Sequence, residues 1–350
     1  MIFQSRPPLG VRKRAARAIL ARVISMSLTS YAFAQGAAAN FAVLSGSDVT
    51  MKNRVNINQV SISNPTCPGS VGCPGDVGGT TVLMGRGNAS APDMISGDVV
   101  ASASASQGMD CSGNPPGTTA VCLGNDSEVA GACVTGGGAV SAPTECANGT
   151  DTTGQNSEVT TLMPQAVSAA ASLSSTLGAM PATQILSAIV VGTKGSTTIT
   201  STTPVNVVSV PSITSGTNST LTLSGAATDM FVINVGSPTT PGSLQIGNNA
   251  SVVLSGGITP DRVIFNLIGT GTAAQLGNHT VFNGTIVAPQ GQFTSGDGNT
   301  PTPVLINGSL WFGESISIGN NTNLNFYPFA GTGGGGTGGG GTTSSTGSTT

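Results

Sequence analysis

Residues 263–287 read VIFNLIGTGTAAQLGNHTVFNGTIV, and this stretch decides the fold class. It contains two short apolar runs, Val263–Leu267 and Val281–Val287, whose first residues are 18 positions apart. Gly, Asn and Thr fill the sequence between the two runs. Short strands at near-regular spacing, separated by turn residues, are typical of the coils of a β-solenoid or of a β-sandwich.

Similar runs continue this rhythm on both sides, and several of their starts are 18 to 23 residues apart. Within each run, apolar residues alternate with small polar ones, as expected for a coil with one buried face. This alternation favours the solenoid over the sandwich. Asn residues at the corners of such coils can stack in ladders that satisfy their amides. The additional runs are Phe231–Val235, Ser251–Leu254, Val304–Phe312 and Leu324–Phe326.

A single long helix is predicted between residues 158 and 182. Apolar residues recur there at steps of three or four, which gives one apolar stripe that should lie against a sheet. Pro164 is tolerated only near a first turn, so the helix should start around residue 160, and Pro181 should end it. The stripe consists of Val159, Leu162, Met163, Ala166, Ala170, Leu173, Leu177 and Met180.

Six cysteines lie within one window of 80 residues, at Cys67, Cys73, Cys111, Cys122, Cys133 and Cys146. An even number of cysteines in an exported protein predicts three disulfides, and fifteen pairings are open. A metal site is not expected, because no C-x-x-C motif occurs and the sole histidine, His279, is far away in sequence. No cofactor site is expected either.

The N-terminal segment has the pattern of a secretory signal. Six of the 11 basic residues precede an uncharged stretch, Val23–Ala34, which ends in the small-x-small triplet Ala32–Ala34. Twelve uncharged residues are too few to span a bilayer. We therefore expect a cleaved signal peptide and a secreted or cell-surface location.

Beyond residue 34 the chain is sparsely charged, with five basic and 14 acidic residues and a net charge of −9. No basic patch remains to hold phosphates, which argues against a nucleic-acid partner. Charged residues make up 7% of the chain, against about 25% in ordinary globular domains. A surface dominated by Ser, Thr and Asn suits contact with a neutral partner better than acid–base chemistry.

Four segments resemble ice-binding-like adhesive domains and, more narrowly, the bacterial choice-of-anchor A family. The resemblance implies a right-handed β-solenoid with one long helix packed alongside, in an exported surface protein. It does not extend to the cysteine region. The segments are FAVLSGSDVT at 41–50, LSSTLGAMP at 173–181, FNGTIVAP at 282–289, and NGSL at 307–310 followed by FYPF at 326–329.

The expected architecture is thus dominated by β-structure, with a disulfide-rich cap or insertion beside the solenoid. The expected segments are a signal peptide (1–34), the first solenoid strands (35–62), the cysteine-rich cap or insertion (63–157), the packing helix (158–182), the solenoid body (183–330) and a flexible Gly/Ser/Thr tail (331–350).

The leading functional hypothesis is an adhesin or extracellular-matrix component that binds a polysaccharide, a host matrix protein or another surface without catalysis. Many weak contacts across a flat face would add through multivalency. Stacked coils also leave open ends, so self-association is a further expectation.

The alternative is ice binding by the same fold, which needs a flat array of small side chains. The candidate binding-face residues are Thr197, Thr198, Thr200, Thr220 and Thr222.

A third hypothesis is a polysaccharide-degrading β-helix enzyme. It requires Asp229, Asp261 and Asp297, together with Glu314, to converge in a groove. Aspartates in such a chain more often cap turns, and no catalytic residue is assigned.

Overall fold

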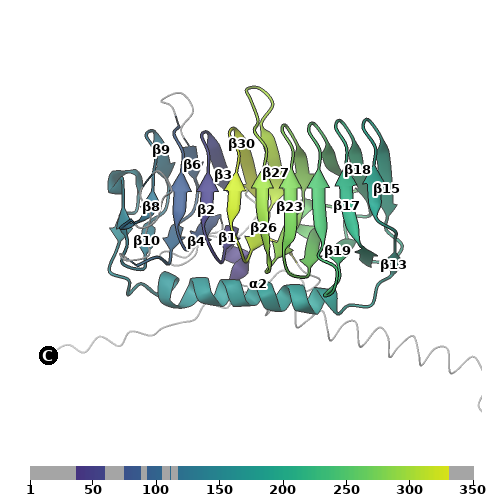
Figure 1. Ribbon diagram of the computed structural model, residues 1–350, viewed down its shortest axis with the longest axis horizontal. Helices are drawn as coiled ribbons and strands as arrows, with labels where there is room; N and C mark the ends of the chain where they lie inside the picture. The colour runs from purple at the N-terminus through teal and green to yellow at the C-terminus, as the bar shows by residue number, and fades with distance from the viewer. Residues whose placement is uncertain (1–36, 60–74, 88–92, 105–110, 112–116, 331–350) are drawn as a thin grey trace, which may run out of the picture. The chain divides into compact units, whose positions relative to one another are not determined.

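The computed structural model describes residues 37–59, 75–87, 93–104, 111 and 117–330. The predicted signal peptide, the Gly/Ser/Thr tail and the cysteines Cys67 and Cys73 lie outside these residues. The described strands form three sheets, A, B and C, and each coil of the chain visits them in that order (Figure 1).

Sheet A has eleven strands in the part of the chain that the structure describes. In spatial order they are β12 (Thr150–Asp151), β10 (Cys133–Thr135), β7 (Val99–Ala101), β4 (Asp76–Gly79), β1 (Phe41–Ser45), β28 (Leu310–Phe312), β25 (Thr285–Ala288), β22 (Val263–Ile268), β19 (Met230–Gly236), β16 (Val205–Val210) and β13 (Gln184–Ile185).

Sheet B follows sheet A in each coil and has ten described strands. Their order is β11 (Ala139–Val140), β8 (Thr119–Cys122), β5 (Val82–Met84), β2 (Val49–Met51), β29 (Ile316–Ile318), β26 (Gly291–Ser295), β23 (Thr272–Leu276), β20 (Ser243–Ile246), β17 (Ser212–Ser215) and β14 (Ile189–Val191).

Sheet C completes each coil with nine described strands. Their order is β15 (Ser196–Thr200), β18 (Thr220–Ser224), β21 (Ser251–Ser255), β24 (Val281–Asn283), β27 (Val304–Gly308), β30 (Thr322–Phe326), β3 (Val55–Gln59), β6 (Asp93–Ile95) and β9 (Ser127–Val129).

Neighbouring strands in all three sheets run parallel, because each coil repeats the path of the one before. This confirms the predicted β-dominated solenoid with one long helix, while the right-handed coiling stays a prediction. The helical segments are η1 (Ala38–Asn40), η2 (Pro143–Glu145), the π-helix η3 (Glu158–Leu162), α2 (Met163–Gly178) and η4 (Pro260–Arg262). No helix among the described residues is long and apolar enough to cross a membrane.

The first and last coils of the chain lie side by side in the middle of the sheets. Strand β1 pairs with β28 on one side and with β4 on the other. The chain coils outward from β1 to β12, helix α2 carries it back along sheet A, and the later coils return from β13 to the middle (Figure 1). The purple N-terminal strands therefore adjoin the yellow C-terminal ones.

Apolar side chains stack in register inside the coils. One inward row in sheet A runs from Ile233 to Phe265 and on to Ile286, and all three are fully buried. Phe265 also contacts Phe282 of sheet C, with ring centroids 5.0 Å apart. The core is thus one continuous column between the three sheets.

Helix α2 covers the outer face of sheet A and is held there by buried amides. Asn266 of β22 donates from Nδ2 to the Ser174 carbonyl at 3.0 Å and to Asn234 Oδ1 at 2.8 Å, and its Oδ1 accepts from Ser174 Oγ at 2.5 Å. Asn234 of β19 donates to the Leu177 carbonyl at 2.8 Å. These bonds fix the position of the helix along the sheet, which apolar contact alone would leave free to slide.

The structure differs from the expected cysteine-rich cap or insertion. The described residues between 76 and 151 form coils of the solenoid itself, and strands β4 to β12 extend all three sheets. Two of the three expected disulfides lie among the described residues, Cys111–Cys122 and Cys133–Cys146. The first ties Cys111 to strand β8, and the second ties strand β10 to Cys146, which lies after η2.

Asn266→Ala should lower the free energy of unfolding by about 2–3 kcal/mol, because it leaves buried groups of Ser174 and Asn234 without partners. Urea denaturation of the purified variant measures this. The matched control is Asn56→Ala on sheet C, where a half-buried amide loses one bond to Asn323, and we expect about 1 kcal/mol or less. Equal losses in the two variants would contradict the role assigned to Asn266.

Candidate binding surface

The three sheets present three outer faces, and helix α2 occupies one of them. The outer side chains Val207, Val232 and Ile264 of sheet A are buried. Sheets B and C keep outer faces on which every second side chain is at least partly exposed over most strands, while Cys122 of β8 is buried by its disulfide to Cys111. A binding surface of the kind predicted must therefore lie on sheet B or sheet C.

The outer face of sheet B, here called the sheet-B face, carries a row of side chains in register across nine strands. Parallel strands lie about 4.8 Å apart, so the row has a regular spacing. None of its members is charged. In spatial order they are Val190, Thr214, Gln245, Gln275, Thr294, Ser317, Thr50, Leu83 and Cys122.

A second row runs beside the first, with Ser212, Ser243, Ala273 and Gln292 in register. Within the part of the chain that the structure describes, the hydroxyls and amides of both rows make no side-chain hydrogen bonds. Their backbone groups are paired along the sheet. The sheet-B face is therefore rigid, uncharged and rich in donors and acceptors that remain available to a ligand.

The outer face of sheet C differs, because its amides bond to one another. Asn325 Nδ2 donates to Asn307 Oδ1 at 2.9 Å, and Asn307 Nδ2 donates to Asn283 Oδ1 at 2.8 Å. Asn283 then donates to the Val252 carbonyl at 2.7 Å. The predicted asparagine ladder thus also forms on a strand face, and it leaves these amides with less capacity for a ligand.

A second ladder follows the corner between sheets B and C. At each step, a side-chain oxygen accepts the backbone N–H of the corresponding residue in the next coil, at 2.8 to 3.1 Å. The next residue often has a positive φ, as at Asn249, His279 and Asn321. This ladder aligns the coils and keeps sheets B and C in register. Its members are Asn248, Asn278, Asp297, Asn320 and Asn53.

The five predicted threonines lie at one end of sheet C. Thr198 pairs with Thr222, and both point outward, as do Thr220 and Thr200. Thr197 pairs with the buried Leu221 and faces the other side of the strand. The structure therefore brings together four of the five, on two strands only. The Thr220 row continues as Ser251, Val281 and Leu305 before it reaches Asn323, and the Thr222 row continues as Val253 on β21.

The candidate carboxylates do not share a groove. Asp229 and Asp261 lie at the corner between sheets C and A, Asp297 lies between B and C, and Glu314 lies between A and B. Asp229 accepts from Ser201 Oγ at 2.6 Å and from the Ala226 N–H, which lowers its pKa. The Asn320 N–H and the nearby Lys52 ammonium lower the pKa of Asp297. Both act as acceptors that hold turns.

His279 is a half-buried corner residue with φ of 54°. Its Nδ1 lies 2.7 Å from the Thr302 carbonyl, which ties one coil to the next. No cluster of three or more His, Cys, Asp or Glu side chains suited to a metal ion occurs among the described residues.

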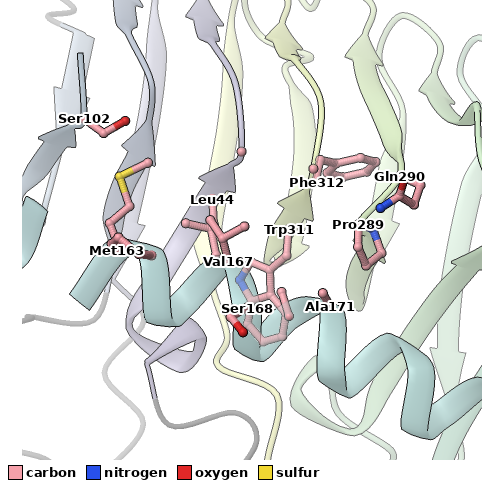
Figure 2. Close-up of a pocket in the computed structure, with 14 residues that line it drawn as sticks. Leu44, Ser102, Met163, Val167, Ser168, Ala171, Pro289, Gln290, Trp311 and Phe312 are labelled. Atoms are coloured by element: carbon pink, nitrogen blue, oxygen red, sulfur yellow. The ribbon is translucent and has the colours of Figure 1, made fainter. Parts of the chain in front are cut away.

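Beside helix α2 there is an apolar groove of about 450 Å³. Figure 2 shows Met163, Val167 and Ala171 along the helix, with Leu44 and Trp311 near Val167 and the Pro289–Gln290 corner above Ala171. Trp311 is fully buried and donates from Nε1 to the Phe41 carbonyl at 2.8 Å. No titratable side chain lines the groove, so it offers no acid–base chemistry.

Buried carboxyls gather where helix η3 meets the coils of β4 and β7. Burial raises the pKa of Asp76 to about 8, although Oδ1 accepts the Asp98 N–H, and the charges of Asp98 and Glu158 raise it further. Burial likewise raises the pKa of Glu158 to about 7, and its Oε2 has no hydrogen-bond partner. Asp76 therefore stays largely protonated at neutral pH, whereas Glu158 begins to ionise there, and both belong to the packing of the fold.

Solved structures similar to this chain are ice-binding proteins. One from the Antarctic ascomycete Antarctomyces psychrotrophicus is 16% identical with a TM-score of 0.49, over 83% of this chain and 96% of that one. One from an Antarctic biological consortium is 16% identical with a TM-score of 0.46, over 83% and 90%. One from an Arctic yeast is 14% identical with a TM-score of 0.44, over 83% and 92%.

No family model matches the sequence, and no curated protein matches it. Identities and TM-scores as low as these assign no family. The ice-binding-like resemblance and the choice-of-anchor A resemblance of the sequence both stay predictions.

Stability should fall as the pH rises from about 4 to about 8. In the unfolded chain the carboxyls of Asp76 and Glu158 ionise near their ordinary pKa values of 3.8 and 4.5, but in the folded chain they stay protonated to about 8 and about 7. The unfolded state therefore loses protons first, with a slope approaching about 1.4 kcal/mol per pH unit for each group.

Urea denaturation at several pH values measures this slope. Asp76→Asn should flatten it. Asp229→Asn should leave it unchanged between pH 6 and 8, because Asp229 has a lowered pKa and is already ionised there. If the free energy of unfolding of the wild type instead rose between pH 6 and 8, burial would not raise the pKa values of Asp76 and Glu158 as described.

Proposed function

We propose that this chain binds ice through the sheet-B face, as a secreted or cell-surface protein that performs no catalysis. The observation that supports the proposal is the in-register row of uncharged side chains across nine strands, flanked by a second row. Export rests on the signal-peptide pattern of residues 1–34.

The uncharged side chains of the sheet-B face suit contact with ordered water. Ice is an extended, uncharged and periodic array of hydrogen-bond donors and acceptors. A charged side chain holds its own hydration water strongly, whereas hydroxyls, amides and methyl groups do not impose a competing order. Side chains such as Thr214, Thr294 and Thr50 have no partner within the described chain, so they can bond to ordered water.

Rigidity adds to this case. The row repeats with the strand spacing, and every strand that carries it, except the edge strand β14, is fixed by hydrogen bonds to two neighbours. Contacts with ice are individually weak, and a preorganised surface lets many of them form together without an ordering cost. Sheet C supports the proposal less well, because its amides already bond to one another, and sheet A is covered by helix α2.

Adhesion to a neutral polysaccharide is the second candidate. The observation that favours it is the group of glutamines, Gln245, Gln275 and Gln292, in adjacent strands of the sheet-B face. Long amide side chains can adapt to sugar hydroxyls, whereas short and rigid side chains match the fixed positions of an ice lattice better.

Thr294→Lys combined with Gln275→Lys should remove most of the thermal hysteresis and of the inhibition of ice recrystallisation. The two residues are register partners at the centre of the sheet-B face, and two ammonium groups would hold disordering hydration water there. The matched control, Val253→Lys, places a charge at an exposed outer position of sheet C and should retain activity.

Wild-type protein without either ice activity would overturn the proposal. Binding of that protein to an insoluble neutral glucan, abolished by the same double substitution, would then favour adhesion. If Val253→Lys alone abolished ice activity, the active face would be sheet C.

A further inference from the structure

The coil formed by β13, β14 and β15, here called the terminal coil, has an open edge. Its strands pair with β16, β17 and β18 on one side, and no described strand pairs with them on the other. Open strand edges present unpaired backbone groups and are the usual sites at which further chains add.

Strand β15 exposes the longest of these edges. Ser201 N–H donates to the Ser224 carbonyl, and Thr220 N–H donates to the Gly195 carbonyl. Because backbone groups alternate along a strand, the N–H and C=O of Thr198 then point to the open edge. The neighbouring Thr200 carbonyl is capped by Gln184 Nε2 at 3.0 Å.

The most exposed large apolar side chains of the described residues also lie on the terminal coil. Ile185 on β13 is 81% exposed and Val190 on β14 is 74% exposed, whereas the next in rank, Val253, is 37% exposed. Leu186 and Ile189 are only partly buried beside them. Apolar side chains gathered at one open edge indicate a surface that a partner covers.

At the opposite end of the solenoid, β11 and β12 have no described strand on their outer side, but the edge strand β9 of sheet C is covered. The Cys133–Cys146 disulfide and helix η2 fold across it, and Cys146 forms an isolated bridge with Val129 of β9. Acidic side chains at Asp126, Glu128, Glu145 and Asp151 surround it. The terminal coil, in contrast, carries Lys194 as its sole charge between residues 181 and 203. Head-to-tail stacking would press β15 of the open edge against the covered and acidic edge of sheet C at β9, whereas two terminal coils meet without such an obstacle.

We propose that the terminal coil binds the terminal coil of a second copy about a two-fold axis. Such an axis, perpendicular to the solenoid, reverses the direction in which the coils run, so facing strands become antiparallel. If β15 pairs with β15 of the partner copy, then β13 of each copy faces β14 of the other. This arrangement places Ile185 of one copy beside Val190 of the other, twice in each dimer.

The size of the edge sets the strength of this dimer. The terminal coil presents residues 184–200, somewhat fewer than the roughly 20–30 residues per side of a standard interface. Only its edge strands supply main-chain bonds. A dimer that dissociates at about 10 µM fits an interface of this size.

Sedimentation velocity of the purified chain from about 1 to about 200 µM tests the proposal. The wild type should shift from monomer to dimer and stop there. Ile185→Asp with Val190→Asp should stay monomeric, because four buried carboxylates would face one another. Thr198→Pro should weaken dimerisation at least tenfold, since it removes an outward N–H that β18 does not use.

The matched control is Val253→Asp, which adds a charge at an exposed apolar site away from the edge and should dimerise as the wild type does. Thermal melting checks that the variants are folded. Three results would each overturn the proposal: a monomeric wild type at every concentration, growth beyond the dimer, or a double Asp variant that dimerises as strongly as the wild type.

Discussion

The structure depends on one constraint, the parallel in-register stacking of successive coils. Because each residue lies above its counterpart in the next coil, like side chains meet, and every row becomes a ladder. Apolar rows such as Ile233, Phe265 and Ile286 build the core. Amide rows such as Asn283 and Asn307 satisfy their own hydrogen bonds. The same stacking gives the outer faces their regular spacing, from which the proposed binding function follows.

Helix α2 makes this stacking compatible with a chain that starts in the middle of the sheets. It carries the chain from one end of the solenoid to the other, so that β1 fills the place next to β28. A helix lying on a flat sheet has no inherent position along it, and the buried bonds from Asn234 and Asn266 supply that position. Register between the two halves of the solenoid therefore depends on a few polar groups as well as on apolar burial.

The sequence predicts the solenoid, the helix and the corner ladders because these depend on local patterns. Runs such as Val263–Leu267 are long enough to show alternation, whereas strands β4 to β10 have three or four residues, many of them small, and resemble loops. The corner motif of Gly followed by Asn, at Gly247–Asn248, Gly277–Asn278 and Gly319–Asn320, marks coils. Its spacing drifts because loops of different length occupy the other corners.

The sheet-B face could not be predicted from such local patterns, since its rows join residues from distant coils and only the register aligns them. The same reason explains why the sequence groups Thr197 with Thr198 although the two point to opposite sides.

The few charged residues of the chain lie mostly at the corners between sheets. All five basic residues beyond residue 34, Lys52, Arg54, Arg86, Lys194 and Arg262, lie at corners between sheets. Most acidic side chains do the same, as acceptors in turns or as buried protonated groups. At a corner a charge can keep its hydration water without touching a ligand that lies flat on a sheet. The sheet-B face between the corners remains neutral, and the open terminal coil is neutral apart from Lys194. Both proposed contacts of this protein, with an ordered neutral surface and with a second copy of itself, use the regions from which charge is absent.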